Sequence, residues 1–218
     1  MNFPNESKAY RSARNKLLGA EKALRRKIEA VAALRRRLPA GGLLREDYVF
    51  ESEAGALKMS GLFVRGDTLL AYSFMYGPKM ANPCPMCTSM LDALNGNAQH
   101  IAQRASLVVI AKSPIERILE FARARGWNNL RLLSCAGNGY NRDYHGEGPD
   151  GSQWPMLNVF ARRKGVVRHF WGSELLGAKS EPGQNGRHVD MLWPLWNALD
   201  QTPEGRGKDW YPKLDYRS

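Results

Sequence analysis

The 218-residue sequence is poor in cysteine and lacks the long apolar runs of a membrane protein. No stretch of about 18 apolar residues occurs, so no transmembrane helix is expected. Residues 1–10 are polar and have no apolar segment of the secretory kind, so we expect a cytoplasmic location and no membrane partner. Three cysteines are too few for a disulfide framework. In a reducing compartment, a close cysteine pair is typical of catalysis or metal binding.

Acidic residues are scarce in the first 45 residues, which hold twelve Lys/Arg and only three Asp/Glu. This segment therefore carries +9 of the formal net charge of +11, and the remaining 173 residues carry only +2. Positive charge supports nonspecific nucleic-acid binding through phosphate contacts. The same segment has an apolar stripe, however, which favours packing with the arginines on a solvated face. We therefore do not expect nucleic acid as a partner.

Apolar residues recur every seven positions in this segment and predict one long helix over residues 6–38. Pro39 and the Gly41-Gly42 pair end it. Residues 1–44 are thus predicted to form a basic amphipathic helix. Its apolar stripe must pack either on the chain's own domain or on a second copy, which would give a homodimer through this helix. The repeat consists of Tyr10, Leu17, Leu24, Val31 and Leu38.

The next segment, residues 45–180, has the pattern of an α/β domain. Apolar runs alternate with helical patterns in the order βαβαβ, which favours parallel strands joined by right-handed crossovers. A β-hairpin follows, with its turn at Lys164-Gly165. The predicted strands are residues 68–74, 107–111 and 130–134, and the hairpin spans 154–160 and 166–171.

These elements predict the fold class: α/β, with a central mixed sheet flanked by helices. A polar segment rich in Gly, Asn and Asp, at about residues 135–153, is expected to be an insertion loop. Residues 181–218 are expected to form an irregular C-terminal extension packed on the domain.

A Cys-x-x-Cys motif, Cys84-Pro85-Met86-Cys87, stands where the first strand ends and a helix begins. At a helix start, a thiolate faces unpaired main-chain N–H groups and the positive end of the helix dipole, which lowers the pKa of the thiol. Pro85 suits the first turn because it has no N–H to lose. We therefore expect an enzyme in which Cys84 is the attacking thiol and Cys87 resolves the mixed disulfide. Thr88 is expected to donate a hydrogen bond to a sulfur.

Two other functions of the motif stay open. A structural zinc site needs two further ligands at matching spacing, which are absent, so no structural metal is expected. The protein could instead be a binding module for a soft metal such as Cu(I), because several methionines lie close to the motif in the sequence. It could also be a thiol-dependent peroxidase, although the peroxiredoxin pattern of Pro, then Thr or Ser, then Cys at fixed spacing is absent. The residues seven positions before the two cysteines are Gly77 and Met80. No glycine-rich dinucleotide loop occurs, and no cofactor is expected.

The insertion loop contains further candidate site residues. Tyr140, Asp143, Tyr144 and His145 combine aromatic, acidic and imidazole groups, and a long loop in a compact domain is often functional. We expect these four residues to form a lid or a substrate wall near Cys84. Cys135 is expected to be a small buried residue, with an accessory thiol as the alternative.

Specific strings spread over nearly the whole chain carry a family resemblance. They are Tyr10-Arg11 with Ala13-Arg14, Val31 to Gly42, Glu46 to Tyr48, Pro83 to Asp92, Ala111 to Arg117, Tyr140 to His145, His169 to Glu174, Thr202 to Gly207 and Asp209 to Pro212. Together they resemble a bacterial family of thioredoxin-like proteins that are predicted dithiol-disulfide oxidoreductases. The resemblance implies a thioredoxin-like fold and a dithiol role, but no substrate. From the dithiol itself we expect a protein or small-molecule thiol or disulfide as substrate.

The thioredoxin fold places a proline, commonly cis, opposite its Cys-x-x-Cys motif. Pro155, at the start of the hairpin, occupies that place, so we expect a cis peptide bond there and Trp154 near the dithiol. The sequence departs from ordinary thioredoxins in one respect. Asn82-Pro83 precedes the motif and Pro85-Met86 fills it, where thioredoxins have a preceding Trp and an interior Gly-Pro.

Overall fold

The computed structural model describes residues 2–184, 192–207 and 209–216, and the chain divides into two compact units, Met1–Ala40 and Gly41–Ser218. The first unit contains the 29-residue helix α1, Lys8–Arg36. The Ser7 hydroxyl caps it by accepting a hydrogen bond from the main-chain N–H of Tyr10 at 3.1 Å. The prediction of a long N-terminal helix is confirmed, and the homodimer through it stays a prediction.

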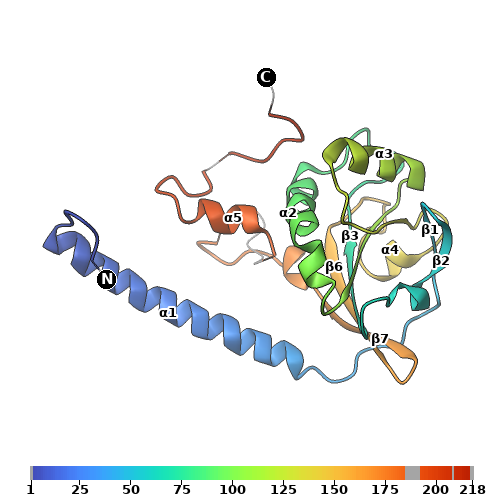
Figure 1. Ribbon diagram of the computed structural model, residues 1–218, viewed down its shortest axis with the longest axis horizontal. Helices are drawn as coiled ribbons and strands as arrows, with labels where there is room; N and C mark the ends of the chain where they lie inside the picture. Colours follow the sequence, from blue (N-terminus) through green and yellow to red (C-terminus); the bar gives the residue numbers. More distant parts are fainter. Residues whose placement is uncertain (1, 185–191, 208, 217–218) are drawn as a thin grey trace. The chain divides into compact units, whose positions relative to one another are not determined.

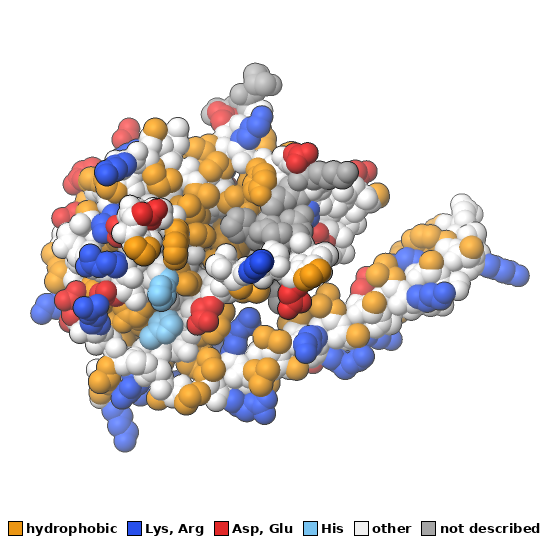
Figure 2. Space-filling model, turned by 180° about the vertical axis from the view of Figure 1, so that it is seen from behind, with side chains coloured by type: hydrophobic (Ala, Val, Ile, Leu, Met, Phe, Trp, Pro, Cys, Tyr) orange, Lys and Arg blue, Asp and Glu red, His pale blue; other side chains and the backbone are white. Residues whose placement is uncertain are grey.

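The polar face of α1 is strongly basic. Lys and Arg side chains follow the helix along its length, and two of them, Arg35 and Arg36, lie in its last turn (Figure 2). Positive charge in the last turn interacts favourably with the helix dipole. Despite its length, α1 is not apolar enough to cross a bilayer, and the same holds for every other helix among the described residues.

The second unit is built on one seven-stranded mixed sheet with the order β2-β1-β5-β4-β3-β6-β7 (Figure 1). Strands β3, β4 and β5 are parallel, and β6 pairs antiparallel with β3. This arrangement confirms the predicted α/β fold of the thioredoxin-like class. The strands are β1 Val49–Ser52, β2 Gly55–Lys58, β3 Thr68–Ser73, β4 Ser106–Ala111, β5 Leu132–Ser134, β6 Met156–Arg163 and β7 Val166–Gly172.

Two helices make the crossovers between the parallel strands. Helix α2, Pro85–Ile101, joins β3 to β4, and α3, Ile115–Arg125, joins β4 to β5. Gly126 ends α3 with φ +76°, a left-handed conformation that glycine adopts without steric cost. The β6–β7 hairpin turns at Lys164 and Gly165, with φ of 50° and 79°. Positive φ at both residues matches the twist of a two-residue hairpin, as the sequence predicted.

The alternation of side chains along the central strands divides the core into two clusters. Tyr72 on β3 belongs to a first cluster with Cys87, Met90 and Leu91 of α2. The preceding residue on β3, Ala71, belongs to a second cluster on the other face of the sheet. The second cluster also contains Tyr48, Phe50, Phe160 and Tyr140. The first cluster therefore contains the cysteine motif and the second does not.

The insertion segment at 135–153 has more structure than the sequence predicted. It contains the short helix α4, Tyr140–Asp143, and an isolated bridge between Glu147 and Gln153. The carbonyl oxygen of Asn141 accepts hydrogen bonds from the N–H groups of Gly146 and Glu147. The segment is thus held by its own main chain.

Parts of the C-terminal extension belong to the core, and the predicted boundaries of the extension stay a prediction. Helix α5, Pro194–Leu199, lies beside α2, and Trp193 and Trp196 are fully buried in the first cluster (Figure 1). The remaining described elements are two short 3₁₀ helices, Met59–Leu62 and Glu174–Leu176.

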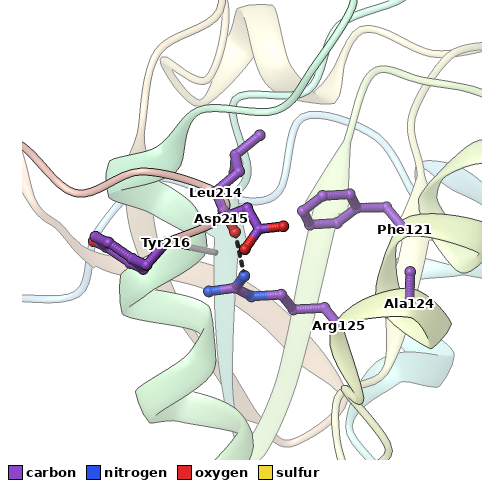
Figure 3. Close-up of a pocket in the computed structure, with 6 residues that line it drawn as sticks. All are labelled: Phe121, Ala124, Arg125, Leu214, Asp215 and Tyr216. Atoms are coloured by element: carbon purple, nitrogen blue, oxygen red, sulfur yellow. Dashed lines mark hydrogen bonds between the residues drawn. The ribbon is translucent and has the colours of Figure 1, made fainter. Parts of the chain in front are cut away.

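Arg125 holds the end of the described tail. Figure 3 shows its side chain extending from α3 to the main chain of Leu214, whose carbonyl oxygen accepts a hydrogen bond at 2.6 Å. The same guanidinium donates twice to Asp92 of α2, at 3.0 and 2.6 Å. Arg125 therefore connects α3 to α2 and to the C-terminal segment. The pocket beside Arg125 has a structural role, because the guanidinium already has carboxylate and carbonyl partners.

The second cluster gives a stability prediction for β1, the strand next to the edge of the sheet. Phe50 is fully buried on β1, and its neighbour Val49 is half exposed. We expect Phe50→Ala to lower the free energy of unfolding by about 3 to 5 kcal/mol, because it leaves a cavity in the core. Val49→Ala is the control and should cost below about 0.5 kcal/mol. Urea unfolding measures both, and equal effects would mean that β1 does not pack on the sheet as described.

Candidate active site

Cys84 is the N-cap residue of α2, and the Cys-x-x-Cys motif forms the first turn of that helix. The carbonyl oxygen of Cys84 accepts the first helical hydrogen bond, from Thr88 N–H at 3.0 Å. Pro85 follows as the first helical residue, where its missing N–H costs nothing. The main-chain N–H groups of Met86 and Cys87 then remain free to donate to the Cys84 sulfur.

These contacts lower the pKa of the Cys84 thiol from its ordinary value of 9.0 to about 6. The largest cause is a hydrogen bond from the Cys87 thiol, and the two main-chain N–H groups add to it against the opposing effect of burial. Cys84 is partly exposed. At neutral pH it is therefore a thiolate that a dissolved substrate can reach.

Cys87 has the opposite environment. It is 1% exposed, and burial raises the pKa of its thiol well above the ordinary value. The neighbouring Cys84 raises it further, whereas the Tyr72 hydroxyl and the Met75 main chain lower it. Two like groups with pKa values pushed in opposite directions can take different roles in one reaction. Cys84 has the properties of a nucleophile, and Cys87 those of a proton-bearing partner.

Tyr72 and Trp193 contact the motif, and no pattern in the sequence indicates either of them as a site residue. Tyr72, on β3, contacts Cys87, and its ring lies 6.4 Å from that of Trp193 in an edge-on arrangement. The Trp193 indole N–H donates to the Met86 carbonyl oxygen at 3.0 Å. Trp193 is 107 positions from Met86 in the chain, so no local sequence signal could have found this contact.

The predicted hydrogen bond from Thr88 to a sulfur is wrong. The Thr88 hydroxyl donates to the carbonyl oxygen of Cys84 at 2.9 Å. A threonine in a helix readily bonds the carbonyl four residues before it, and Cys84 stands at that position. Thr88 therefore supports the first turn of α2 through the main chain.

The predicted cis peptide bond at Pro155 is also wrong, since every peptide bond among the described residues is trans. The trans form is the intrinsically favoured one, and the chain before Pro155 is held by a 3.0 Å hydrogen bond from Trp154 N–H to Gly146. Pro155 precedes β6, whose first residue, Met156, pairs with Ser73 at the end of β3. Trp154 is 46% exposed.

The four candidate lid residues take different places. Tyr140 is fully buried in the second cluster, so its side chain belongs to the core and is not available as a substrate wall. Asp143 accepts hydrogen bonds from Tyr48 and Arg45, both at 2.7 Å.

The other two candidates differ from each other as well. The Tyr144 ring packs edge-on against Phe160 with centroids 4.9 Å apart. His145 lines a cavity together with Trp154, Pro155 and Met156. His145 is thus the candidate that the structure brings beside Pro155.

Cys135 lies in the second cluster, on the opposite face of the sheet from Cys87. Its thiol is fully buried and donates to the Ala111 carbonyl oxygen at 3.4 Å. Burial raises the pKa of this thiol to about 12. These properties fit the buried-core interpretation of Cys135 and give it no thiolate at neutral pH.

The family model described as "Bacterial protein of unknown function (DUF899)" matches residues 1–216. The chain belongs to this family. The family resemblance seen in the sequence is thereby confirmed. The description assigns no activity, so the chemistry of this DUF899 member has to come from its site.

Several solved structures are similar to this DUF899 chain at low identity. Thioredoxin peroxidase I of Plasmodium yoelii is 16% identical, with a TM-score of 0.45, over 74% of this chain and 90% of that one. A C84S mutant of Xanthomonas campestris peroxiredoxin Q is 14% identical, with a TM-score of 0.44, over 62% and 87%. The exposed lipoprotein thioredoxin Etrx1 of Streptococcus pneumoniae is 12% identical, with a TM-score of 0.41, over 64% and 91%.

The methionines around the motif of this DUF899 member have packing roles. Met86 and Met90 are buried in the first cluster. The Met80 sulfur accepts a hydrogen bond from the Gly77 N–H at 3.2 Å. Within the described part of the chain, no group of three or more His, Cys, Asp or Glu side chains is placed to hold a metal ion.

The hydrogen bond between the two thiols gives a pH prediction. In a Cys135→Ala background, alkylation of Cys84 should follow a midpoint near the pKa of about 6. The rate should rise with pH through this midpoint and level off above it, because only the thiolate reacts.

Two variants at Cys87 separate the effect of the Cys87 thiol on the pKa of Cys84 from the effect of the main-chain N–H groups. Cys87→Ala removes the donor, and the midpoint should move up toward 9.0, the ordinary value. Cys87→Ser keeps a hydrogen-bond donor, and its midpoint should stay closer to that of the parent protein. Identical midpoints in all three proteins would show that Cys87 does not set the acidity of Cys84.

Proposed function

We propose that the protein is a thiol–disulfide oxidoreductase in which Cys84 is the nucleophile and Cys87 the resolving thiol. The observation that carries the proposal is the opposite environment of the two sulfurs. Cys84 is partly exposed with its pKa lowered to about 6, and Cys87 is buried with its pKa raised. A reactive thiolate beside a protonated partner one helical turn away is the arrangement that dithiol exchange needs.

In the reducing direction, the Cys84 thiolate attacks one sulfur of a protein or small-molecule disulfide. A bond forms between Cys84 and that sulfur, the substrate disulfide breaks, and the other substrate sulfur leaves as a thiolate. Cys87 then loses its proton and attacks the Cys84 sulfur. The mixed disulfide breaks, the second substrate thiolate leaves, and Cys84 and Cys87 become a disulfide. Two electrons have passed to the substrate, which takes up two protons.

The mixed disulfide itself activates Cys87. Part of the rise in the pKa of Cys87 comes from the Cys84 thiolate. Once Cys84 is bonded to substrate it carries no charge, so that contribution is lost. The Tyr72 hydroxyl and the Met75 main chain still favour the Cys87 thiolate. The resolving thiol therefore becomes more acidic when its attack is required.

A glutathione redox titration tests the proposal. The wild-type protein should pass through one two-electron transition between the dithiol and a Cys84–Cys87 disulfide, which mass spectrometry of alkylated samples resolves. In Cys87→Ser, glutathione should stay attached to Cys84 as a trapped mixed disulfide. Cys135→Ala should titrate like wild type, because that buried thiol lies on the other face of the sheet.

Failure of Cys84 and Cys87 to pair under oxidising conditions would refute the oxidoreductase proposal. Elemental analysis of the purified protein then tests soft-metal binding, which predicts stoichiometric metal that is lost in Cys84→Ser. Rapid oxidation of the dithiol by peroxide, without exchange with disulfides, would instead favour a peroxidase.

A further inference from the structure

Arg117, on α3, is surrounded by main-chain carbonyl oxygens of the loop that leads from β3 to the cysteine pair. Its guanidinium donates to Ala81 at 2.8 Å, and to Gly77 and Pro78 at 3.4 and 3.5 Å. It also donates to the carbonyl oxygen of Met80. One side chain thus binds four carbonyl groups that lie close together in the chain.

The guanidinium is also fixed from one side by an aromatic ring. Its central carbon lies 4.4 Å from the centre of the Tyr76 ring, a cation–π contact. Tyr76 is buried, and its carbonyl oxygen accepts a hydrogen bond from Ser113 N–H at 2.9 Å. Since Ser113 lies two residues after the end of β4, the residue whose ring supports Arg117 is itself tied to the sheet.

The loop that Arg117 holds is in contact with both cysteines. Its ends meet where the Cys84 N–H donates to the Met75 carbonyl oxygen at 3.0 Å. The Met75 main chain also contacts the Cys87 thiol. The four carbonyl groups bound by Arg117 lie between these two residues in the chain. A change in the path of this loop therefore changes the surroundings of both sulfurs.

We propose that Arg117 is a positioning residue for the dithiol: its guanidinium fixes the loop 77–81, and that loop fixes Cys84 and Cys87 through the Met75 main chain. Carbonyl dipoles that converge on one point repel each other unless a cation lies between them. The planar guanidinium, with five N–H donors, can bind several carbonyls and stack on a ring at once. The role of Arg117 in catalysis rests on the function proposed above.

The test compares Arg117→Ala and Arg117→Lys with a matched control, Arg123→Ala. Arg123 lies on the same helix and makes an exposed ion pair with Glu53 at 3.2 Å. All variants carry Cys135→Ala, and the readouts are the pH midpoint of Cys84 alkylation and the reduction potential of the dithiol. A purely structural residue would change the melting temperature without changing either readout.

We expect Arg117→Ala to raise the alkylation midpoint by about one pH unit, which lowers the thiolate fraction at pH 5 about tenfold. Arg117→Lys keeps the charge but offers fewer donors, and should give a smaller shift in the same direction. Guanidinium ion at non-denaturing concentration should restore the Arg117→Ala protein toward wild type. Arg123→Ala should leave both readouts unchanged.

Folded Arg117 variants with wild-type midpoints and potentials would overturn the proposal, whatever their melting temperatures. If Arg117→Ala does not fold, Arg117→Lys decides the question alone. The alkylation midpoint needs no disulfide chemistry, so it separates this inference from the proposed function. Failure of the wild-type cysteines to pair would refute the oxidoreductase and leave the positioning role of Arg117 to its own test.

Discussion

The proposed dithiol chemistry depends on one hydrogen bond, from the buried Cys87 thiol to the Cys84 sulfur at the start of α2. That bond lowers the pKa of one cysteine and helps to raise the pKa of the other. It exists because the Cys-x-x-Cys spacing places both sulfurs on the first turn of a helix, where the N–H groups of Met86 and Cys87 have no helical partner and donate to the Cys84 sulfur. The proton therefore stays on Cys87 and the negative charge on Cys84, which is the starting state that the proposed exchange reaction needs.

Remote segments hold this first turn in place. The loop from Met75 closes on the Cys84 N–H, and α3 supplies Arg117 to the carbonyl groups of that loop. The C-terminal segment supplies Trp193, whose indole N–H binds the Met86 carbonyl oxygen. These polar contacts from neighbouring elements add to the burial of Met86 and Cys87 in the first cluster.

The sheet separates the reactive pair from the third thiol. Tyr72 and Ala71 are neighbours on β3, yet they belong to different clusters because side chains alternate along a strand. Cys87 lies with Tyr72, and Cys135 lies with Ala71. Tyr140, on α4, is also buried in the second cluster, together with the aromatic rings of Tyr48 and Phe50. Neighbouring residues of β3 therefore pack in different clusters. Tyr72 packs in the cluster that contains Cys87, and Ala71 packs in the cluster on the other face of the sheet.

The sequence by itself determined the features that depend on short-range pattern: the long N-terminal helix, the strand–motif–helix unit, the Lys164-Gly165 hairpin and the position of Cys84 at a helix start. Periodicity, proline and glycine act over a few residues, so they can be recognised without a structure. Only the tertiary structure decided the trans bond before Pro155, the burial of Tyr140 and the contacts of Tyr72, Arg117 and Trp193. These features depend on packing between segments that are far apart in the chain. A local sequence pattern does not indicate which distant side chain will contact a given residue.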